Sequence, residues 1–175
     1  AETHGFGTTP YPKSYRGNLR LTTADTTLAA SLFKRINPFV PPEVSLPDGS
    51  EWEVCGLNES FRLSKYLPGD LFKTHVDGKF LRSPDEQSMF TVNAYLNGDF
   101  SGGSTRFYND ERDQVIAEIK PKAGGPCLIF RQPPGAYLPH DGEKVTKGEK
   151  YLLRSDVMYR RKVSILLPTE AEVVT

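Results

Sequence analysis

Cysteine is scarce in this sequence, with only Cys55 and Cys127 among 175 residues. The two do not form a CxxC pair, and two isolated cysteines provide no framework of disulfides for a small secreted domain. Both lie in apolar, strand-like runs, so we interpret them as small buried hydrophobic residues. This usage is consistent with a reducing compartment, and we expect a cytoplasmic protein.

An excess of charge of one sign is also missing, because 22 basic side chains balance 22 acidic ones. This balance gives no support for binding to nucleic acid or to a membrane surface. No apolar run approaches the roughly 18 residues that a membrane-spanning helix needs. The length favours a single domain over residues 1–175.

Only one segment has a clear helical pattern. Thr23 is expected to cap a helix over residues 24–36, with Asp25 in its first turn. The flanking segments are rich in Gly and Pro. We expect an N-terminal tail or lining segment at residues 1–13 and a loop at residues 37–50.

Short strands dominate the rest of the chain. They are expected over residues 52–56, 60–66, 71–76, 88–97, 104–109, 115–120, 126–131, 149–157 and 160–167. Short strands separated by turn signals, together with one helix, predict a mainly β protein, a barrel or sandwich with helical support.

The strand expected over residues 88–97 has an apolar face and a more polar face. The first consists of Phe90, Val92, Ala94 and Leu96, and the second consists of Met89, Thr91, Asn93 and Tyr95. We expect the apolar face to pack beneath the helix. The polar face suits either the wall of a polar cavity inside a barrel or a surface in contact with water.

Histidine is nearly as scarce as cysteine, with His4, His75 and His140. His75 and Asp77 lie two residues apart at a strand end, so their side chains point the same way and can bind one metal ion. A distant imidazole would complete the set of two histidines and one carboxylate that leaves open positions on iron(II). His140 is the candidate, because His4 lies in the tail. The alternative is an exposed histidine beside an Asp-Gly turn.

A second feature is the run Lys-Tyr-Leu-Leu-Arg that begins at Lys150. Lys150, Leu152 and Arg154 share one face of the expected strand. An inward cation there would suit a buried carboxylate, which is costly to bury without a partner. Alternatively, Lys150 ends the strand in solvent.

These features belong to a longer series of spaced motifs. The motifs are SFRLSKYLPGDLFKTHVD (60–77), SMFTVNAYLN (88–97), GGSTRF (102–107) and LPHDGEKVTKGEK (138–150). Over about residues 14–160 the chain resembles the prolyl-4-hydroxylase-like Fe(II)/2-oxoglutarate-dependent dioxygenases. The resemblance implies a double-stranded β-helix (jelly-roll, cupin-like) core with supporting helices.

The resemblance also implies roles for individual residues. His75, Asp77 and His140 match the iron ligands and so the catalytic centre. The residues that match the 2-oxoglutarate pocket are Lys150, Tyr95, Thr91 and Tyr66. Lys150 would pair with the 5-carboxylate of the co-substrate. Arg154 would either share that carboxylate or face the substrate, and we favour Lys150 for the co-substrate.

The implied reaction uses Fe(II), O2 and 2-oxoglutarate, sometimes with ascorbate, to hydroxylate an organic substrate while succinate and CO2 are released. A prolyl residue in a protein or peptide is the expected substrate, with residues 78–87 and 132–137 as candidate groove loops. The chain departs from the collagen-type enzymes after Lys150, in the stretch Arg154-Ser155-Asp156-Val157. This departure leaves the substrate open.

Two other interpretations remain. A hydroxylase of a free amino acid or small metabolite would have a closed pocket with charged anchors such as Arg154, Arg62 or Arg106. A jelly-roll binding module without catalysis belongs to a different class, and the intact set of candidate ligands argues against it.

Overall fold

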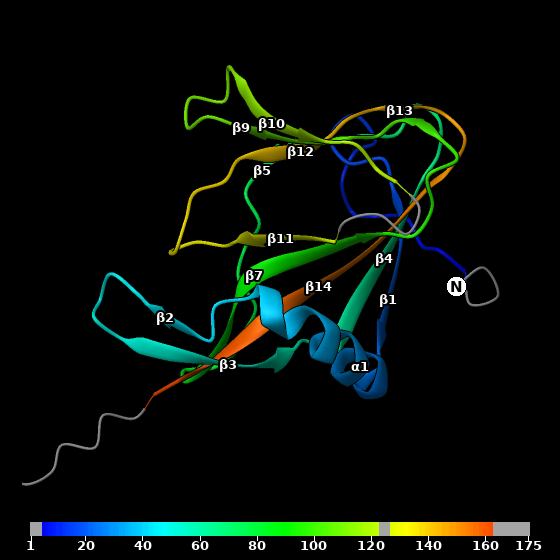
Figure 1. Ribbon diagram of the computed structural model, residues 1–175. Coiled ribbons are helices and arrows are strands. Elements are labelled where there is room, and N and C mark those ends of the chain that lie inside the picture. The colour runs from blue at the N-terminus through cyan, green and yellow to red at the C-terminus, as the bar shows by residue number, and fades with distance from the viewer. Residues whose placement is uncertain (1–4, 123–126, 163–175) are drawn as a thin grey trace, which may run out of the picture.

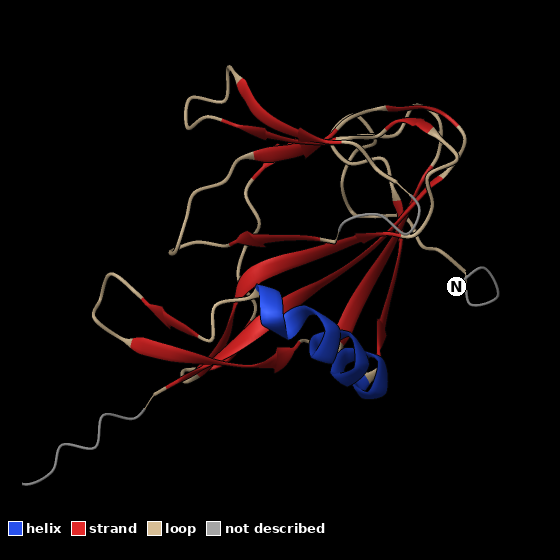
Figure 2. Cartoon of the chain, in the orientation of Figure 1, coloured by secondary structure: helices blue, strands red, loops and turns tan. Residues whose placement is uncertain are grey.

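The computed structural model describes residues 5–122 and 127–162. Its elements are β1 (Leu19–Ala24), α1 (Thr26–Ile36), the 3-10 helix η1 (Asn37–Phe39), β2 (Glu43–Ser45), β3 (Glu51–Leu57), β4 (Ser60–Tyr66), β5 (Phe72–His75), β6 (Leu81–Ser83), β7 (Glu86–Tyr95), β8 (Ser101–Gly102), β9 (Thr105–Tyr108), β10 (Val115–Ile119), β11 (Leu128–Arg131), β12 (His140–Gly142), β13 (Val145–Lys147) and β14 (Lys150–Arg161). Strands dominate the part of the chain that is described (Figure 2), which confirms the mainly β class.

The described strands form antiparallel sheets. The largest has the order β1-β4-β14-β3-β2, and β7 joins it by pairing with β14, β11 and β6. A four-stranded sheet has the order β10-β9-β12-β5, and β13 pairs with β8. In the view of Figure 1 the four-stranded sheet lies above β7, β11 and β14, and α1 lies below them. The large sheet therefore has one face toward the helix and another toward the second sheet.

Strand β14 is the centre of the large sheet, because β3, β4 and β7 all pair with it. Two strands were expected here, over 149–157 and 160–167, but a single strand runs from Lys150 to Arg161. It continues without a break because Met158 and Tyr159 are fully buried in the middle of the sheet. The part of the second expected strand beyond residue 162 lies outside the described residues.

The helix begins later than expected. Asp25, not Thr23, is its N-cap, and the Asp25 carboxylate accepts a hydrogen bond of 2.8 Å from the backbone N–H of Leu28. Thr23 cannot cap the helix because it belongs to β1, opposite Phe61 of β4. Pairing of β1 with β4 thus overrides the local capping signal.

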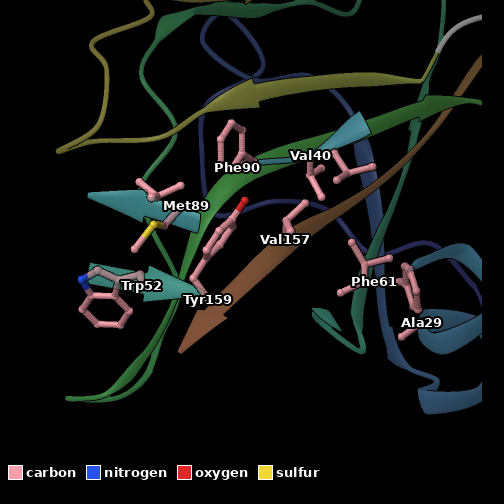
Figure 3. Packing of buried hydrophobic residues seen from close by; sticks show 11 residues of the cluster. Ala29, Val40, Trp52, Phe61, Met89, Phe90, Val157 and Tyr159 are labelled. Atoms are coloured by element: carbon pink, nitrogen blue, oxygen red, sulfur yellow. The ribbon is translucent and has the colours of Figure 1, made fainter. Parts of the chain in front are cut away.

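The apolar face of β7 packs toward the helix, as expected. Phe90 and Val92 belong to a buried cluster that includes Ala29 of α1, and Figure 3 shows Phe90, Val157 and Ala29 among its members. Leu96 was expected on this face, but it is 50% exposed. The prediction failed there because β7 ends at Tyr95, one residue earlier.

Met89 also departs from its expected place on the polar face, because it belongs to the apolar cluster. The cause is a β-bulge. Val157 lies opposite Phe90 and Met158 lies opposite Ser88, so Met89 has no partner on β14 and the side-chain alternation is interrupted. The alternation between Thr91 and Tyr95 is unaffected.

Both cysteines are exposed, so their interpretation as buried residues was wrong. Cys55 shares the outer face of β3 with Glu51 and Glu53, while Trp52 is buried on the inner face. The segment 37–50 is not wholly a loop either, because it contains η1 and β2. None of the helices in the described ranges is long and apolar enough to cross a membrane.

Candidate active site

The second sheet brings together the three candidate metal ligands. His75 ends β5, His140 begins β12, and these two residues lie directly opposite each other. Asp77 follows β5 by two residues, with its carboxylate oxygens 3.6 Å from the Nε2 atoms of His75 and His140. All three potential ligand atoms lie within 4.8 Å of one another. The expected convergence of these side chains is confirmed, and His4 lies outside the described residues.

Backbone carbonyl groups orient both imidazole rings. Nδ1 of His75 is 2.8 Å from the carbonyl oxygen of Lys73, and Nδ1 of His140 is 2.9 Å from that of Leu138. A proton on Nδ1 is donated to the carbonyl in each case, which leaves the lone pair on Nε2. Hydrogen bonding of this kind is typical of metal-ligating histidines.

Aromatic rings enclose the two histidines. Phe72 stacks on His75 with ring centroids 3.6 Å apart. Phe130 lies edge-on to His140 at 4.9 Å, and Phe107 is tilted against it at 5.5 Å. These contacts limit rotation of the imidazoles and exclude water from one side of the site.

The electrostatics favour the protonation states that a metal requires. Burial opposes ionisation of Asp77, but the adjoining His75 ring and the Arg154 guanidinium outweigh it and hold the pKa of Asp77 well below its ordinary value. Burial lowers the pKa of His140. A carboxylate and a neutral imidazole are the metal-binding forms.

A buried chain of hydrogen bonds supports Asp77 from behind. The hydroxyl of Thr91 donates to Asp77 at 2.9 Å, and Nε2 of Gln132 donates to Thr91 at 3.0 Å and to Asp156 at 2.9 Å. Ser88 donates to the side-chain oxygen of Gln132 at 2.7 Å. Thr91 was expected to line the co-substrate pocket, but its hydroxyl instead fixes the carboxylate of the candidate ligand.

Arg154 lies beside the metal site and not beside Lys150. Its guanidinium is 2.9 Å from Asp77 and 3.6 Å from Asp156. Asp156 also accepts a hydrogen bond of 2.8 Å from Arg62, which lies directly opposite Arg154 on β4. Sequence reasoning missed Asp156 and Gln132 as site residues. The one available signal was Asp156 itself, a carboxylate in the middle of a predicted strand.

Lys150 is 2% exposed, so it is not a solvated strand end. Its Nζ donates a 2.6 Å hydrogen bond to the carbonyl oxygen of Gly103 and lies over the rings of Tyr66, at 5.2 Å, and Tyr95, at 5.3 Å. Burial lowers its pKa to about 8. Glycine suits position 103, because its φ of +71° is in the left-handed region and a Cβ would lie 3.1 Å from the Lys150 side chain. Within the described part of the chain, Lys150 has no carboxylate partner within 4 Å.

The two tyrosines of the expected 2-oxoglutarate pocket lie beside this lysine. The Tyr95 hydroxyl is 2.6 Å from Oγ1 of Thr105, and burial raises the pKa of Tyr95. Burial raises the pKa of Tyr66 to about 12, so both hydroxyls stay protonated as hydrogen-bond donors. Tyr95 is 5% exposed, which confirms the expected strand register between Thr91 and Tyr95.

One pocket connects the metal site with Lys150. It is partly open to solvent, and its lining residues are Arg16, Arg62, Ser64, Tyr66, Phe72, His75, Asp77, Asn93, Thr105, His140, Asp141, Gly142, Lys150, Leu152 and Arg154. Arg106 is not among them, and it forms an ion pair with Asp141 at 2.5 Å. Neither expected groove loop, 78–87 or 132–137, contributes a lining residue.

Comparison with known families gives one match. The family described as the 2OG-Fe(II) oxygenase superfamily matches residues 61–155, more than half of the chain. The matched range contains all three candidate ligands and Lys150. No curated protein sequence gives a significant match.

Solved structures share the fold at low sequence identity. A prolyl-4-hydroxylase from Pseudomonas putida is 16% identical, with a TM-score of 0.59 over 93% of this chain and 80% of that one. The viral collagen prolyl hydroxylase of Paramecium Bursaria Chlorella virus-1, in complex with 2OG, is 20% identical, with a TM-score of 0.55 over 83% and 80%. A Trichoplax adhaerens prolyl hydroxylase, in complex with a hypoxia inducible factor peptide fragment, is 17% identical, with a TM-score of 0.57 over 84% and 65%. The common architecture is the double-stranded β-helix, or jelly roll.

Proposed function

Because the chain belongs to the 2OG-Fe(II) oxygenase superfamily, we propose that it hydroxylates a prolyl residue in a protein or peptide and converts 2-oxoglutarate to succinate and CO2. Membership makes it a 2-oxoglutarate-dependent dioxygenase whose cofactors are Fe(II) and 2-oxoglutarate. The observation that carries the proposal is the convergence of His75, Asp77 and His140 within 4.8 Å. A buried Lys150 lies in the same pocket.

The side chains present fit both groups. Two imidazole nitrogens and one carboxylate are the donor set of non-haem iron(II) oxygenases, and this set leaves positions open for co-substrate and O2. Lys150 is a buried cation that has no ion-pair partner among the described residues, and a dianionic co-substrate would supply one. When bound, the iron supplies the activation of O2 that breaks an unreactive C–H bond.

In this proposal each residue has a distinct task. His75, Asp77 and His140 hold the iron, and Lys150 binds the 5-carboxylate of 2-oxoglutarate. The two nearby tyrosines, Tyr66 and Tyr95, present hydroxyl groups to the same end of the co-substrate. Phe72 and the other aromatic rings around the histidines exclude water from the reacting centre, which suppresses unproductive chemistry.

The proposed substrate class is supported by the kinds of proteins that share the fold. The compared structures include a collagen prolyl hydroxylase and a prolyl hydroxylase with a bound peptide fragment. A protein or peptide substrate is therefore the first choice, in preference to nucleic acid. A cytoplasmic location and a single domain over residues 1–175 are part of the same proposal.

A free amino acid or small metabolite is the second candidate substrate. The observation in its favour is that Arg62 and Arg154, two of the three anchors considered for such a substrate, line the pocket. Arg106, the third, does not line the pocket and forms an ion pair with Asp141.

Mass spectrometry tests the proposal directly. The protein is incubated with Fe(II), 2-oxoglutarate, ascorbate and a library of proline-containing peptides, and products heavier by one oxygen are sought together with succinate. His140→Ala should abolish both products. Arg160→Gln, which changes an exposed residue beyond the pocket, is the control. If free amino acids gain oxygen and no peptide does, the second candidate replaces the first.

A further inference from the structure

We propose that the prime substrate carries a carboxylate close to the carbon that is hydroxylated, and that Arg16, Arg62 and Arg154 bind this carboxylate. This inference rests on the proposed function and names the chemistry of its substrate. Among the lining residues of the pocket, four cations face two carboxylates, Asp77 and Asp141. Positive charge is therefore in excess in the pocket.

Neither lining carboxylate is free to neutralise the arginines. Asp77 lies 2.9 Å from Arg154, but it is a candidate metal ligand, so a bound dication would take up its charge. Asp141 accepts two hydrogen bonds from Arg106, at 3.0 and 2.5 Å. The remaining nearby carboxylate is Asp156, behind the pocket wall, and it is shared between Arg62 and Arg154. One carboxylate thus serves two guanidinium groups.

The strand register brings several positively charged side chains close together. Arg154 of β14 lies opposite Arg62 of β4, and Arg20 of β1 lies opposite Ser64, which lines the pocket two residues along β4. Like charges on opposite residues destabilise a sheet. Burial lowers the pKa of Arg20, and the positive charges of Arg16, Arg62 and Arg154 lower it further.

Several of the donors have no partner. Within the described residues, Nε of Arg154 and Nε of Arg20 are buried without a hydrogen bond. Arg16 has no carboxylate within 4 Å in that part of the chain; its Nε donates to Asn18 at 2.9 Å, and its guanidinium lies 4.3 Å above the ring of Phe72. Unpaired buried donors are costly. A substrate anion in the pocket would offer an acceptor to Arg154 and Arg16, which line it.

The location limits which carboxylate can bind. Arg154 touches Asp77, and Phe72 beneath Arg16 stacks on His75, so the arginines lie beside the proposed iron site. A bound carboxylate must belong to the hydroxylated residue itself or to its immediate neighbour in a peptide. The two sources are the free α-carboxylate of a terminal or free proline and the side chain of an adjacent Asp or Glu.

Paired peptides separate these sources. Peptides ending in proline are compared as free acids and C-terminal amides, and internal prolines are compared beside Asp or Asn. Free proline is compared with prolinamide. Binding to the Mn(II)- and 2-oxoglutarate-loaded protein is measured without O2 by calorimetry, and hydroxylation is measured with Fe(II). We expect the acid member of at least one pair to bind roughly ten- to a hundredfold tighter, the range for charge-assisted hydrogen bonds.

Arg16→Gln is the decisive variant, because Arg16, unlike Arg154, has no ion pair with Asp77. It should reduce the preference for the acid member to about twofold and leave the Kd for 2-oxoglutarate unchanged. Arg160→Gln, an exposed change at the far end of β14, should alter neither value.

Three outcomes would overturn the inference. Equal affinity for acids and amides would do so, and prolyl hydroxylation could still stand. Weaker 2-oxoglutarate binding in Arg16→Gln would assign the arginines to the co-substrate. An acid preference that survives in Arg16→Gln would place the anion elsewhere. If carboxylate-bearing non-prolyl compounds are oxidised in an Arg16-dependent manner and no prolyl compound is, the inference holds and the proposed function fails.

Discussion

Replacement of Lys150 by alanine should weaken 2-oxoglutarate binding by roughly ten- to a hundredfold or more. The lysine is 2% exposed, and its one hydrogen-bond acceptor among the described residues is a backbone carbonyl. Two opposite charges 4 Å apart attract by about 4 kcal/mol at an effective dielectric constant of 20, and desolvation offsets part of this. A net contribution of about 1.5–3 kcal/mol remains, which corresponds to that change in Kd.

The assay is an anaerobic titration of 2-oxoglutarate into the Fe(II) protein, followed through the metal-to-ligand absorption band. Lys147→Ala removes an exposed lysine three residues earlier and should leave the Kd unchanged. Iron binding itself should persist in Lys150→Ala, because Lys150 is not a candidate ligand. If Arg154→Ala abolishes the titration and Lys150→Ala does not, the two cations have the reverse of the proposed roles.

The pH dependence gives a second readout of the same lysine. Its pKa of about 8 means that Lys150 in the free protein is charged below pH 8 and loses its charge above it. Because only the charged form pairs with a carboxylate, the Kd should be lowest below pH 8 and rise by up to about tenfold per pH unit above it. A Kd in Lys150→Ala that keeps this slope would show that another group is responsible.

Three further predictions follow from contacts described above. Thr91→Val should weaken Fe(II) binding by roughly tenfold, measured by metal titration, because it removes the hydrogen bond to Asp77; unchanged affinity would show that Asp77 needs no such support. Chemical denaturation of the metal-free protein should show that Lys150→Met gains stability relative to wild type at pH 7 and that this difference shrinks toward pH 10. The folded state lowers the lysine pKa from 10.5 to about 8, so the unfolded chain binds more protons between these values and wild-type stability rises with pH; a difference that is constant with pH would contradict the shift. Asp25→Ala should lower stability by about 1 kcal/mol and the Tm by about 2–4 °C, because the helix loses its cap, whereas Asp110→Ala should have little effect.

The candidate ligands could be predicted from the sequence because their signals are local or periodic. His75 and Asp77 are two residues apart, and the alternation in β7 correctly places Tyr95 on the buried polar face. A prediction of this kind holds as long as the strand keeps its regular side-chain alternation. The same argument failed for Met89, where a bulge interrupts the alternation.

What the sequence did not reveal depends on contacts between distant strands. Gln132 joins Thr91 and Asp156, which are 41 and 24 residues away, and no spacing rule links these positions. Thr23 gave a misleading local signal because pairing of β1 with β4 determines where the helix starts. Arg16 could not be assigned at all, since its place in the pocket comes from packing on Phe72.

Strand β14 gives the site a fixed length scale. Lys150, at its first position, and Arg154, beside Asp77, stand four residues apart on one continuous strand, so about 13 Å of backbone separates the proposed anchor of 2-oxoglutarate from the arginine beside the proposed iron site. Neighbouring strands on both sides hold this spacing, and neither end can shift without breaking the sheet. The affinity for keto diacids should therefore depend on their chain length. One added or missing carbon displaces the distal carboxylate from Lys150 by one carbon–carbon bond, ~1.5 Å. Selectivity for the five-carbon acid should then depend on the strand as well as on the residues that touch the ligand.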